Sequence, residues 1–209
     1  MTNKKTKISS LKQFDNEFYQ NGKESILGID EVGRGCLAGP VVIAGVIVKK
    51  DFYDQRINDS KKLTKKLIIE LSELIKDHSI AFEIVFIEPG VIDQLNILKA
   101  TILGVEQVIA SLKSKSTTIL VDYLYKGYEN NDITMIKKGD ATSFSIACAS
   151  ILAKNARDQY MKKMSTIYPF YGFETNVGYP TKKHYQMIEK YGITPLHRRS
   201  FRLTSKSYQ

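Results

Sequence analysis

Residues 26–50 read ILGIDEVGRGCLAGPVVIAGVIVKK and contain two apolar segments joined by a glycine-rich turn. The segment 26–32 predicts a strand. The segment 40–50 is β-branched and almost entirely apolar, which is typical of a strand buried on both faces. Asp30 and Glu31 close the first strand, although charged groups are rarely buried unless they are paired or bound to metal. Acids at the end of such a strand indicate a functional site at this edge of a sheet.

The rest of the chain alternates between strand and helix patterns. Further strands are predicted at 80–87, 117–122 and 133–136. Helices are predicted at 64–78, 89–113, 143–168 and 182–191. This order predicts an α/β fold with a mixed five-stranded sheet flanked by helices and a small C-terminal helical extension.

The length of 209 residues suits one domain overall. We divide it into a basic N-terminal lead-in at 1–25, a core at 26–168 and a C-terminal extension at 169–209.

The charge is positive and uneven. The chain has 31 Lys and Arg against 22 Asp and Glu, a formal net charge of +9. Residues 1–13 contain four lysines and no acid, and residues 181–209 contain seven Lys or Arg and one acid. Such an excess attracts polyanions, and nucleic acid is favoured over membrane because no basic amphipathic helix with opposed Trp or Phe stands out. The alternative interpretation is a solvated surface of a lysine-rich protein.

Several classes of protein are disfavoured by the composition. The longest apolar run, 41–48, is too short to cross a bilayer, and no apolar segment follows the basic N-terminus as in a secretory signal. Two cysteines, Cys36 and Cys148, cannot form a disulfide scaffold. We therefore expect a reduced, cytoplasmic, monomeric protein with no membrane association.

Two further acids stand at similar places. Asp122 closes the strand at 117–122, and Asp140 precedes the long helix. If the strands at 26–32 and 117–122 are neighbours, their terminal acids converge, and divalent cations would neutralise them. Oxygen-only ligands suit Mg²⁺ or Mn²⁺. Adjacent strand residues point to opposite faces, so Asp30 and Glu31 share one site only if the strand ends or bends there. The alternative is that each acid caps an element or pairs with a lysine.

The glycine spacing at Gly33, Gly35 and Gly39 has a competing interpretation as a dinucleotide-binding turn. Such a turn must open a helix, so that the pyrophosphate meets the helix N-terminus. Here the turn leads into Pro40 and a β-branched strand, which disfavours this interpretation.

Six sequence blocks, taken in order, resemble the type 2 ribonucleases H, the ribonuclease HII family. They are GIDEVGRGCLAGPVVIAGVIV, DSKKLT at 59–64, ILVD ending at Asp122, KKGDATSFSIACASILAKNARD at 137–158, YGFETNVGYPTKKH at 171–184 and HRRSF at 197–201. They span residues 26–201, nearly the whole chain.

The resemblance implies a ribonuclease H-like fold with a two-metal active site that uses Mg²⁺ or Mn²⁺. The matching catalytic, metal-binding acids are Asp30, Glu31, Asp122 and Asp140. The implied activity is endonucleolytic cleavage of the phosphodiester 5′ to ribonucleotides, which leaves 3′-hydroxyl and 5′-phosphate ends. The implied substrates are RNA–DNA hybrids and duplex DNA that contains single ribonucleotides.

The resemblance also implies that 26–168 is the catalytic core and that the extension at 169–209 contributes to substrate binding. It further implies a set of substrate-binding residues. Gly33, Arg34 and Gly35 match a motif whose backbone reads the ribonucleotide 2′-hydroxyl, the group that separates RNA from DNA. Tyr179 matches a tyrosine that stacks on the next sugar. The candidate phosphate contacts are Lys154, Arg157, Arg198 and Arg199, with plain surface charge as the alternative for each. Asp158 is expected to pair with a neighbouring base.

Alternatives and departures remain within this resemblance. A ribonuclease HIII-like hybrid nuclease would have threonine at Arg34 and an additional N-terminal domain, and a non-catalytic nucleic-acid-binding protein would have a broken acid set. Cys36 replaces a proline usual in the family, and residues 123–126 replace a loop that more often begins with glycine. The three histidines, His78, His184 and His197, have no metal-ligand spacing, and we expect them to be non-catalytic.

Overall fold

The computed structural model describes residues 8–116, 118–122 and 133–204. Its centre is a five-stranded sheet in the order β3-β2-β1-β4-β5. The strands are β1 (Ile26–Val32), β2 (Val41–Val48), β3 (Ser79–Ile87), β4 (Thr118–Asp122) and β5 (Ile133–Ile136). The first three pair antiparallel, while β1, β4 and β5 run parallel. The predicted mixed sheet is therefore confirmed.

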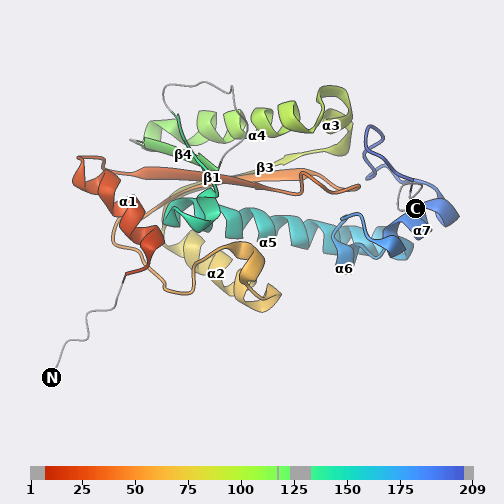
Figure 1. Ribbon diagram of the computed structural model, residues 1–209, viewed down its shortest axis with the longest axis horizontal. Coiled ribbons are helices and arrows are strands. Elements are labelled where there is room, and N and C mark those ends of the chain that lie inside the picture. Colours follow the sequence, from red (N-terminus) through yellow and green to blue (C-terminus); the bar gives the residue numbers. More distant parts are fainter. Residues whose placement is uncertain (1–7, 117, 123–132, 205–209) are drawn as a thin grey trace.

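Helices cover both faces of this sheet (Figure 1). They are α1 (Ser10–Gln20), α2 (Lys65–Asp77), α3 (Pro89–Leu95), α4 (Ile97–Leu112), α5 (Phe144–Ile167), α6 (Phe173–Asn176) and α7 (Lys182–Tyr191). Helices α3 and α4 lie on one face, and α5 with α2 lies on the other. Each face buries its own apolar cluster, which gives the three-layer arrangement expected of an α/β fold.

The central strand β2 is buried along its whole length, as its composition predicts. Val42 and Ala44 face the cluster under α2 and α5, whereas Ile43 and Ile47 face the cluster under α4. On the neighbouring strand, a Cβ at Gly28 would lie 2.3 Å from the Ser145 backbone. The absence of a side chain there lets the start of α5 lie directly on β1.

The segment 89–113 differs from its prediction as one helix. It forms α3 and α4, which are separated at Asn96. Asn96 has a φ of 70°, and its side-chain oxygen accepts hydrogen bonds from the backbone N–H groups of Leu98 (3.0 Å) and Lys99 (3.1 Å). Asparagine tolerates this backbone region and caps helices well, so one residue ends α3 and starts α4. The continuous apolar periodicity on both sides concealed this break.

The predicted lead-in contains a helix that belongs to the folded body. Asp15 of α1 is buried, and its carboxylate accepts hydrogen bonds from the Ser143 hydroxyl (2.6 Å) and from the Ser145 N–H (2.8 Å) and hydroxyl (2.6 Å). These groups lie at the start of α5. On the same helix, the buried Lys12 donates to the Lys50 carbonyl at 2.9 Å. Helix α1 therefore acts as a distant N-terminal cap for α5.

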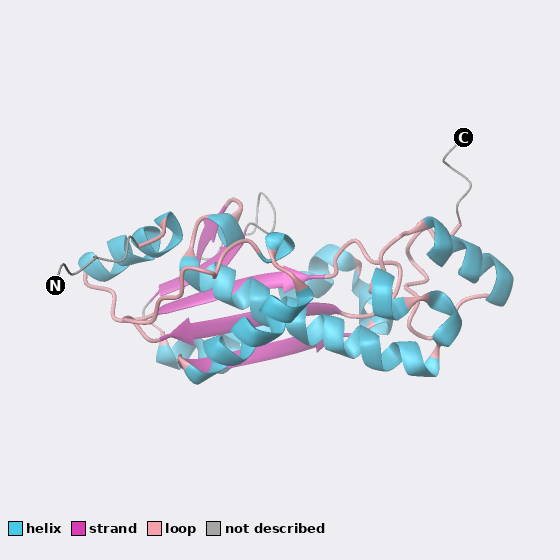
Figure 2. Cartoon of the chain, turned by 90° about the horizontal axis from the view of Figure 1, so that it is seen from below, coloured by secondary structure: helices cyan, strands magenta, loops and turns pink. Residues whose placement is uncertain are grey.

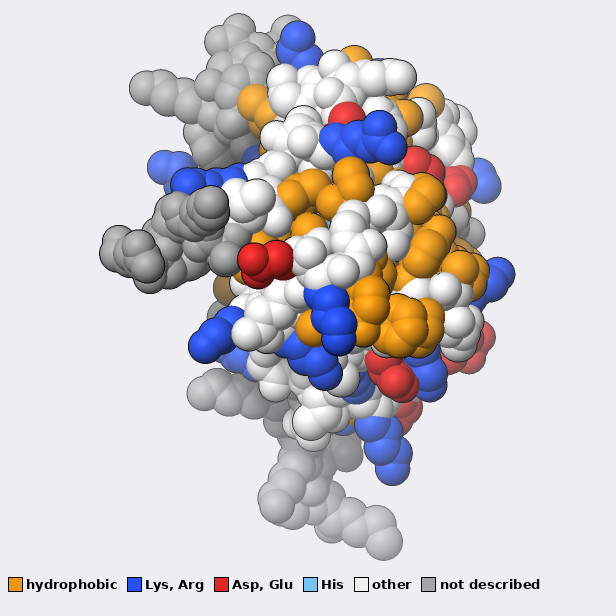
Figure 3. Space-filling model, turned by 90° about the vertical axis from the view of Figure 1, so that its right-hand side faces the viewer, with side chains coloured by type: hydrophobic (Ala, Val, Ile, Leu, Met, Phe, Trp, Pro, Cys, Tyr) orange, Lys and Arg blue, Asp and Glu red, His pale blue; other side chains and the backbone are white. Residues whose placement is uncertain are grey.

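The C-terminal extension lies beyond the end of the sheet, around the last turns of α5 (Figure 2). It has its own apolar cluster, which includes Met161 of α5, Phe173 of α6 and Ile188 of α7. The end face of the molecule carries hydrophobic side chains interspersed with Lys and Arg (Figure 3). Of the described helices, none is by itself long and apolar enough to cross a membrane; α3 and α4 together meet that test but are bent by 117°.

Candidate active site

Three of the four predicted acids line one cavity at the ends of two neighbouring strands. Strands β1 and β4 are parallel and adjacent, with Ile29 paired to Val121, so Asp30 and Asp122 stand at the same sheet edge. The cavity has a volume of about 300 Å³. Its lining residues are Asp30, Glu31, Val32, Gly33, Arg34, Gly35, Ser60, Lys61, Asp122, Ser150, Lys154 and Tyr179. The predicted convergence at the strand ends is therefore confirmed for these three carboxylates.

Asp30 and Glu31 share this cavity in the part of β1 that extends beyond its pairing with β4. Asp30 is buried and is hydrogen-bonded to Ser150 of α5, and its Oδ1 accepts the backbone N–H of Glu31 at 2.8 Å. Glu31 turns toward the glycine-rich turn, where its Oε1 lies 3.2 Å from the Arg34 guanidinium. The strand ends at Val32, and Gly33 follows with a φ of 92°. Asp30 and Glu31 still pair with β2, but the pairing of β1 with β4 ends at Ile29, so both side chains reach the open edge of the sheet although adjacent strand residues point to opposite faces.

The electrostatics of the cavity disfavour several uncompensated negative charges. Burial raises the pKa of Asp30 well above its ordinary value, and the negative charge of the neighbouring Glu31 raises it further by a smaller amount. Burial also raises the pKa of Glu31, although the Arg34 guanidinium opposes that shift. Asp122 raises the pKa of both groups. Such a cavity favours a bound cation over a bound anion.

The fourth acid, Asp140, lies beside the other three. It is buried on the 3₁₀ turn Gly139–Ala141, whose Gly139 N–H donates to Asp122 Oδ1 at 2.8 Å. Asp140 Oδ2 accepts from the Lys61 ammonium at 2.8 Å. Lys61 also lines the cavity and is not among the predicted site residues, although it lies in the DSKKLT motif at 59–64.

The donor set fits a hard divalent cation. All four acids offer carboxylate oxygens, the ligands that Mg²⁺ and Mn²⁺ prefer. Two of the carboxylates pair instead with cationic side chains, Glu31 with Arg34 and Asp140 with Lys61. Within the described residues, no three His, Cys, Asp or Glu side chains already stand in an arrangement that could hold a metal ion.

Gly33 and Gly35 of the turn differ in the space around the position that a Cβ atom would occupy. A Cβ on Gly33 would lie 2.3 Å from Arg157 Nε, and its φ of 92° is strained for other residues. Gly35 is exposed, and no heavy atom of the described chain lies within 4 Å of the position of an added Cβ. The described fold therefore explains Gly33 but offers no steric reason for Gly35.

Arg157 and Arg198 are not the surface phosphate contacts that the sequence predicted. Both side chains are fully buried, at 0% exposure. Arg198 donates to the carbonyls of Gly33 (2.7 Å), Arg34 (2.9 Å) and Gly39 (3.0 Å). Its guanidinium therefore binds the buried side of the turn, where a phosphate cannot reach it.

Arg157 clamps the other side of the same loop. It donates to the carbonyls of Ala38 (3.2 Å), Pro40 (3.1 Å) and Val177 (2.8 Å). It thereby joins the loop between β1 and β2 to the C-terminal extension. The sequence could not distinguish these two arginines from surface charges, because their burial depends on segments distant along the chain.

The other two basic candidates remain accessible. Lys154 lines the cavity, and its ammonium pairs with Asp158 at 2.5 Å, which confirms the expected pairing of that acid with a neighbouring base. Arg199 is exposed, and its backbone N–H donates to Asp93 at 2.9 Å. Both stay predictions as phosphate contacts.

Tyr179 lies at the rim of the cavity with 39% of its surface exposed. Its hydroxyl interacts with the buried thiol of Cys36, and the Arg157 guanidinium carbon lies 5.8 Å from its ring centroid. The thiol that replaces the usual proline therefore contacts a candidate substrate-binding side chain. The other noted departure, residues 123–126, lies outside the described residues.

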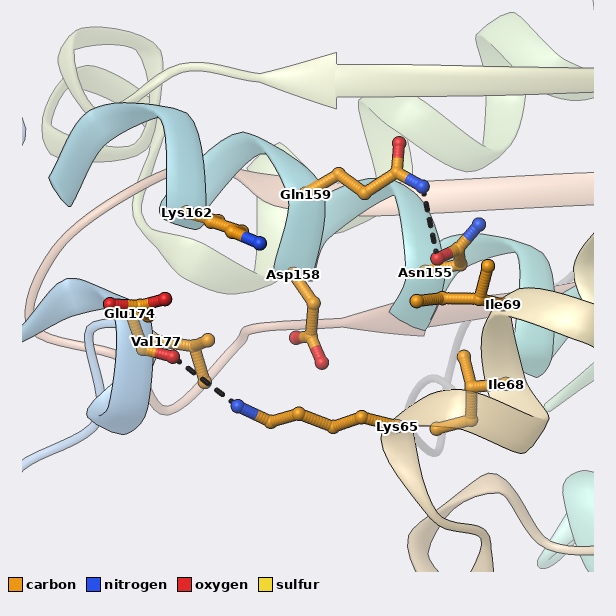
Figure 4. Close-up of a pocket in the computed structure, with 9 residues that line it drawn as sticks. All are labelled: Lys65, Ile68, Ile69, Asn155, Asp158, Gln159, Lys162, Glu174 and Val177. Atoms are coloured by element: carbon orange, nitrogen blue, oxygen red, sulfur yellow. Dashed lines mark hydrogen bonds between the residues drawn. The ribbon is translucent and has the colours of Figure 1, made fainter. Parts of the chain in front are cut away.

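A second cavity lies between α2, α5 and α6, with a volume of about 290 Å³ (Figure 4). Asp158 points into it from α5, while Lys65 of α2 reaches across it to the Glu174 carbonyl at 3.3 Å. Among the described residues, Asp158 Oδ1 has no hydrogen-bond partner. This cavity does not include any of the four candidate acids.

Known proteins of one family are similar to this chain over most of its length. A family model described as Ribonuclease HII matches residues 27–204. A ribonuclease HII from Oceanobacillus iheyensis is 48% identical over 191 residues, which cover 91% of this chain and 73% of that protein.

Solved structures show the same fold. The RNase HII structure in the PCNA:RNase HII complex from Archaeoglobus fulgidus matches with a TM-score of 0.73 and 23% identity, over 88% of this chain and 98% of that chain. Bst-RNase HIII in complex with Mn²⁺ matches with a TM-score of 0.67 and 17% identity, over 86% of this chain and 68% of that chain. At these identities the two structures support the ribonuclease H-like fold alone.

Proposed function

This chain belongs to the ribonuclease HII family, and from that premise we propose that the cavity at the ends of β1 and β4 is its nuclease active site. The family activity is endonucleolytic cleavage of RNA in RNA–DNA hybrids, and it depends on metal. The finer proposal is cleavage of the phosphodiester 5′ to a ribonucleotide, including a single ribonucleotide embedded in duplex DNA. The products would carry 3′-hydroxyl and 5′-phosphate ends.

One observation supports this proposal above the others. Three acids, the glycine turn and Tyr179 line the same cavity of about 300 Å³. Metal ligands and sugar-reading groups must lie within one nucleotide of each other for cleavage beside a ribonucleotide. A non-catalytic binding protein would not need buried carboxylates at this point, since they repel the phosphates that it binds.

The four acids have complementary roles in this proposal. Asp30, Glu31, Asp122 and Asp140 hold Mg²⁺ or Mn²⁺ in a two-metal site. When bound, the ions supply a water activated for in-line attack and stabilise the leaving 3′-oxygen. Lys61 and Arg34 form ion pairs with Asp140 and Glu31 and so offset part of the negative charge of the site.

The turn and Tyr179 supply the substrate discrimination. Gly35 leaves open space at the surface of the turn, so that backbone groups of residues 33–35 can approach a ribose 2′-hydroxyl. The ring of Tyr179 then stacks on the following sugar and favours a deoxyribose there. Arg34, in place of the threonine of ribonuclease HIII, supports HII-type recognition of the junction.

The remaining features set the environment of the reaction. Lys154 and Arg199 are proposed phosphate contacts, with further attraction from the net charge of +9. Both cysteine thiols are free and buried, which supports action in the reducing cytoplasm. We propose that the chain acts as a monomer in excising RNA from DNA.

The testing experiment is cleavage of an end-labelled DNA duplex that carries one ribonucleotide, with Mg²⁺, Mn²⁺ or EDTA. An RNA strand paired to DNA is run beside it. We expect metal-dependent cleavage of both, with a cut on the 5′ side of the single ribonucleotide. Asp122→Asn should lower the rate on the order of 10²–10³-fold or more, because it removes charge that stabilises the transition state.

The matched control is Asp77→Asn, an exposed acid at the end of α2, which should cleave at the wild-type rate. Near-normal turnover by Asp122→Asn would contradict the assignment of the metal ligands. Products ending in a 2′,3′-cyclic phosphate would contradict the role of the activated water. Cleavage of the long hybrid alone would overturn the proposed reading of the junction.

A further inference from the structure

Two buried histidines outside the cavity contact each other. His184 of α7 and His197 of the following segment are 0% and 2% exposed, and their Nε2 atoms lie 3.1 Å apart. The rings of Tyr171 and Phe173 pack around both of them. Two nitrogens at this distance must share one proton, which makes the protonation of each ring deducible from its other contacts.

The contacts of His197 with Thr194 determine the tautomer of His197. The Thr194 backbone N–H donates to His197 Nδ1 at 2.9 Å, and the Thr194 hydroxyl lies 2.9 Å from the same nitrogen. A backbone N–H can only donate, so Nδ1 of His197 carries no proton. The proton of neutral His197 is therefore on Nε2, where it points at His184.

The contacts of His184 lead independently to the same assignment of protons in the pair. His184 Nδ1 lies 3.0 Å from the backbone carbonyl of Tyr179, and a carbonyl can only accept. His184 therefore carries its proton on Nδ1, and its Nε2 accepts from His197. A further proton on either ring would either place two N–H groups head to head or oppose the Thr194 N–H. Burial also lowers the pKa of both histidines, which supports a neutral pair.

The chain of hydrogen bonds ends on a residue that the proposed function uses. Tyr179 follows a short irregular segment, in which its own N–H donates to the Asn176 carbonyl at 2.8 Å. His184 holds the carbonyl of the same residue from the buried side. The same carbonyl also accepts the Thr181 N–H at 2.9 Å, so the backbone on both sides of the Tyr179 Cα is held, and with it the position of the ring at the cavity rim.

We propose that His184 and His197 are positioning residues, which hold the Tyr179 backbone through a directed hydrogen-bond chain and so set the ring for stacking on the substrate sugar. The inference rests on the proposed role of Tyr179. Neither histidine touches the substrate, so the sequence-based expectation that they are non-catalytic is compatible with this role.

The test compares two substitutions of similar size at His184. His184→Asn retains an N–H donor near the Nδ1 position, whereas His184→Leu removes it. With the single-ribonucleotide duplex, we expect His184→Leu to lower kcat/KM on the order of 10–100-fold, because a shift of about 1 Å in a positioning group costs up to about 10²-fold. His184→Asn should stay within about three-fold of wild type, and His78→Leu is the matched control at a distant ring.

A double-mutant cycle separates positioning from a general loss of structure. If His184 acts through Tyr179, the His184→Leu substitution adds no further loss in a Tyr179→Ala background. Additive losses, or equal losses for His184→Leu and His184→Asn, would overturn the inference while the proposed function stands. If Tyr179→Ala itself cleaves the junction normally, both the proposed role of Tyr179 and the inference fail.

A spectroscopic measurement on the wild-type protein tests the chain without any variant. Nitrogen-15 NMR of the imidazole rings at neutral pH should show the proton of His184 on Nδ1 and that of His197 on Nε2. The reverse tautomers, or a charged ring, would overturn the inference. This result does not depend on whether a substituted protein folds.

Discussion

At the scale of single residues, alanine substitutions at Gly33 and Gly35 can be compared directly, because the two glycines lie in the same turn but in different surroundings. Gly33→Ala should destabilise the protein by about 1–3 kcal/mol, because its φ of 92° is strained for alanine and its Cβ would overlap Arg157. Gly35→Ala should change stability by less than about 0.5 kcal/mol, since its Cβ would point into open space.

The activities of the two variants should not follow their stabilities. Gly35→Ala is expected to lower kcat/KM for the embedded ribonucleotide on the order of 10-fold, because a methyl group would displace the sugar. Urea denaturation and junction cleavage measure the two effects. A Gly35→Ala protein with full junction activity would show that the turn does not approach the ribose.

The neutral histidine pair predicts a dependence of stability on pH. Burial, with a smaller effect from the neighbouring His184, lowers the pKa of His197 to about 4 in the folded protein. In the unfolded chain the same side chain has its ordinary pKa of 6.5. The unfolded state therefore binds more protons between these values, and the stabilising contribution is complete above pH 6.5 and lost toward pH 4. Of the two rings that surround the pair, only Tyr171 is titratable, and burial raises its pKa.

His197→Asn isolates this contribution. The difference in free energy of unfolding between wild type and His197→Asn should be constant above pH 7. It should shrink as the pH falls from 6.5 toward 4, since only the wild type loses the contribution. Urea titrations at each pH measure it, and the raised pKa values of Asp30 and Glu31 cancel in the difference. A difference that does not change with pH would contradict the neutral pair.

At the scale of elements, α1 and α5 depend on one carboxylate. Asp15→Ala should cost about 1–3 kcal/mol, because it leaves the Ser145 N–H and two hydroxyls at the start of α5 without their acceptor. Denaturant unfolding followed by circular dichroism measures the loss. Asp77→Ala, at an exposed position, serves as the control. An unchanged midpoint in Asp15→Ala would mean that α1 is not needed for the start of α5.

The break between α3 and α4 illustrates how one polar side chain redirects an element. Apolar periodicity continues across Asn96, so pattern alone predicts one helix. The positive φ of Asn96 and its bonds to Leu98 and Lys99 turn the chain instead. The result brings both helices over the β1–β2–β3 face of the sheet.

At the scale of the whole molecule, the buried and exposed basic residues should affect substrate binding differently. Lys154→Ala should reduce the slope of log binding constant against log salt by about 1, because a phosphate contact releases one counterion. Arg198→Gln should lower stability and cleavage but leave that slope unchanged, since its guanidinium is buried and, within the described part of the chain, donates to the turn carbonyls named above.

The measurement is fluorescence anisotropy with a labelled duplex at 50–200 mM salt in EDTA. Each variant is compared with wild type at equal folded fraction. A reduced slope for Arg198→Gln would mean that this arginine reaches phosphate after all. An unchanged slope for Lys154→Ala would remove Lys154 from the interface and leave its pairing with Asp158 as its function.

The sequence by itself determined the strands, most of the helices and the acids at the strand ends. These features depend on local periodicity and on neighbours a few residues away, as in 26–32 and 182–191, whose predicted bounds match the structure. The motif order also identified the family, because each motif is a short local string. Asp30 and Asp122 come together simply because β1 and β4 are neighbours in the sheet.

Only the tertiary structure decided which polar groups are buried and what they contact. Arg157 and Arg198 became internal clamps, and Asp15 reached Ser143 across 128 residues of sequence. His184 and His197 likewise meet only because the C-terminal extension folds back on itself. Burial and hydrogen-bond partners at such separations are set by packing, which local patterns do not encode, because the free energy of a charge depends on its surroundings in three dimensions.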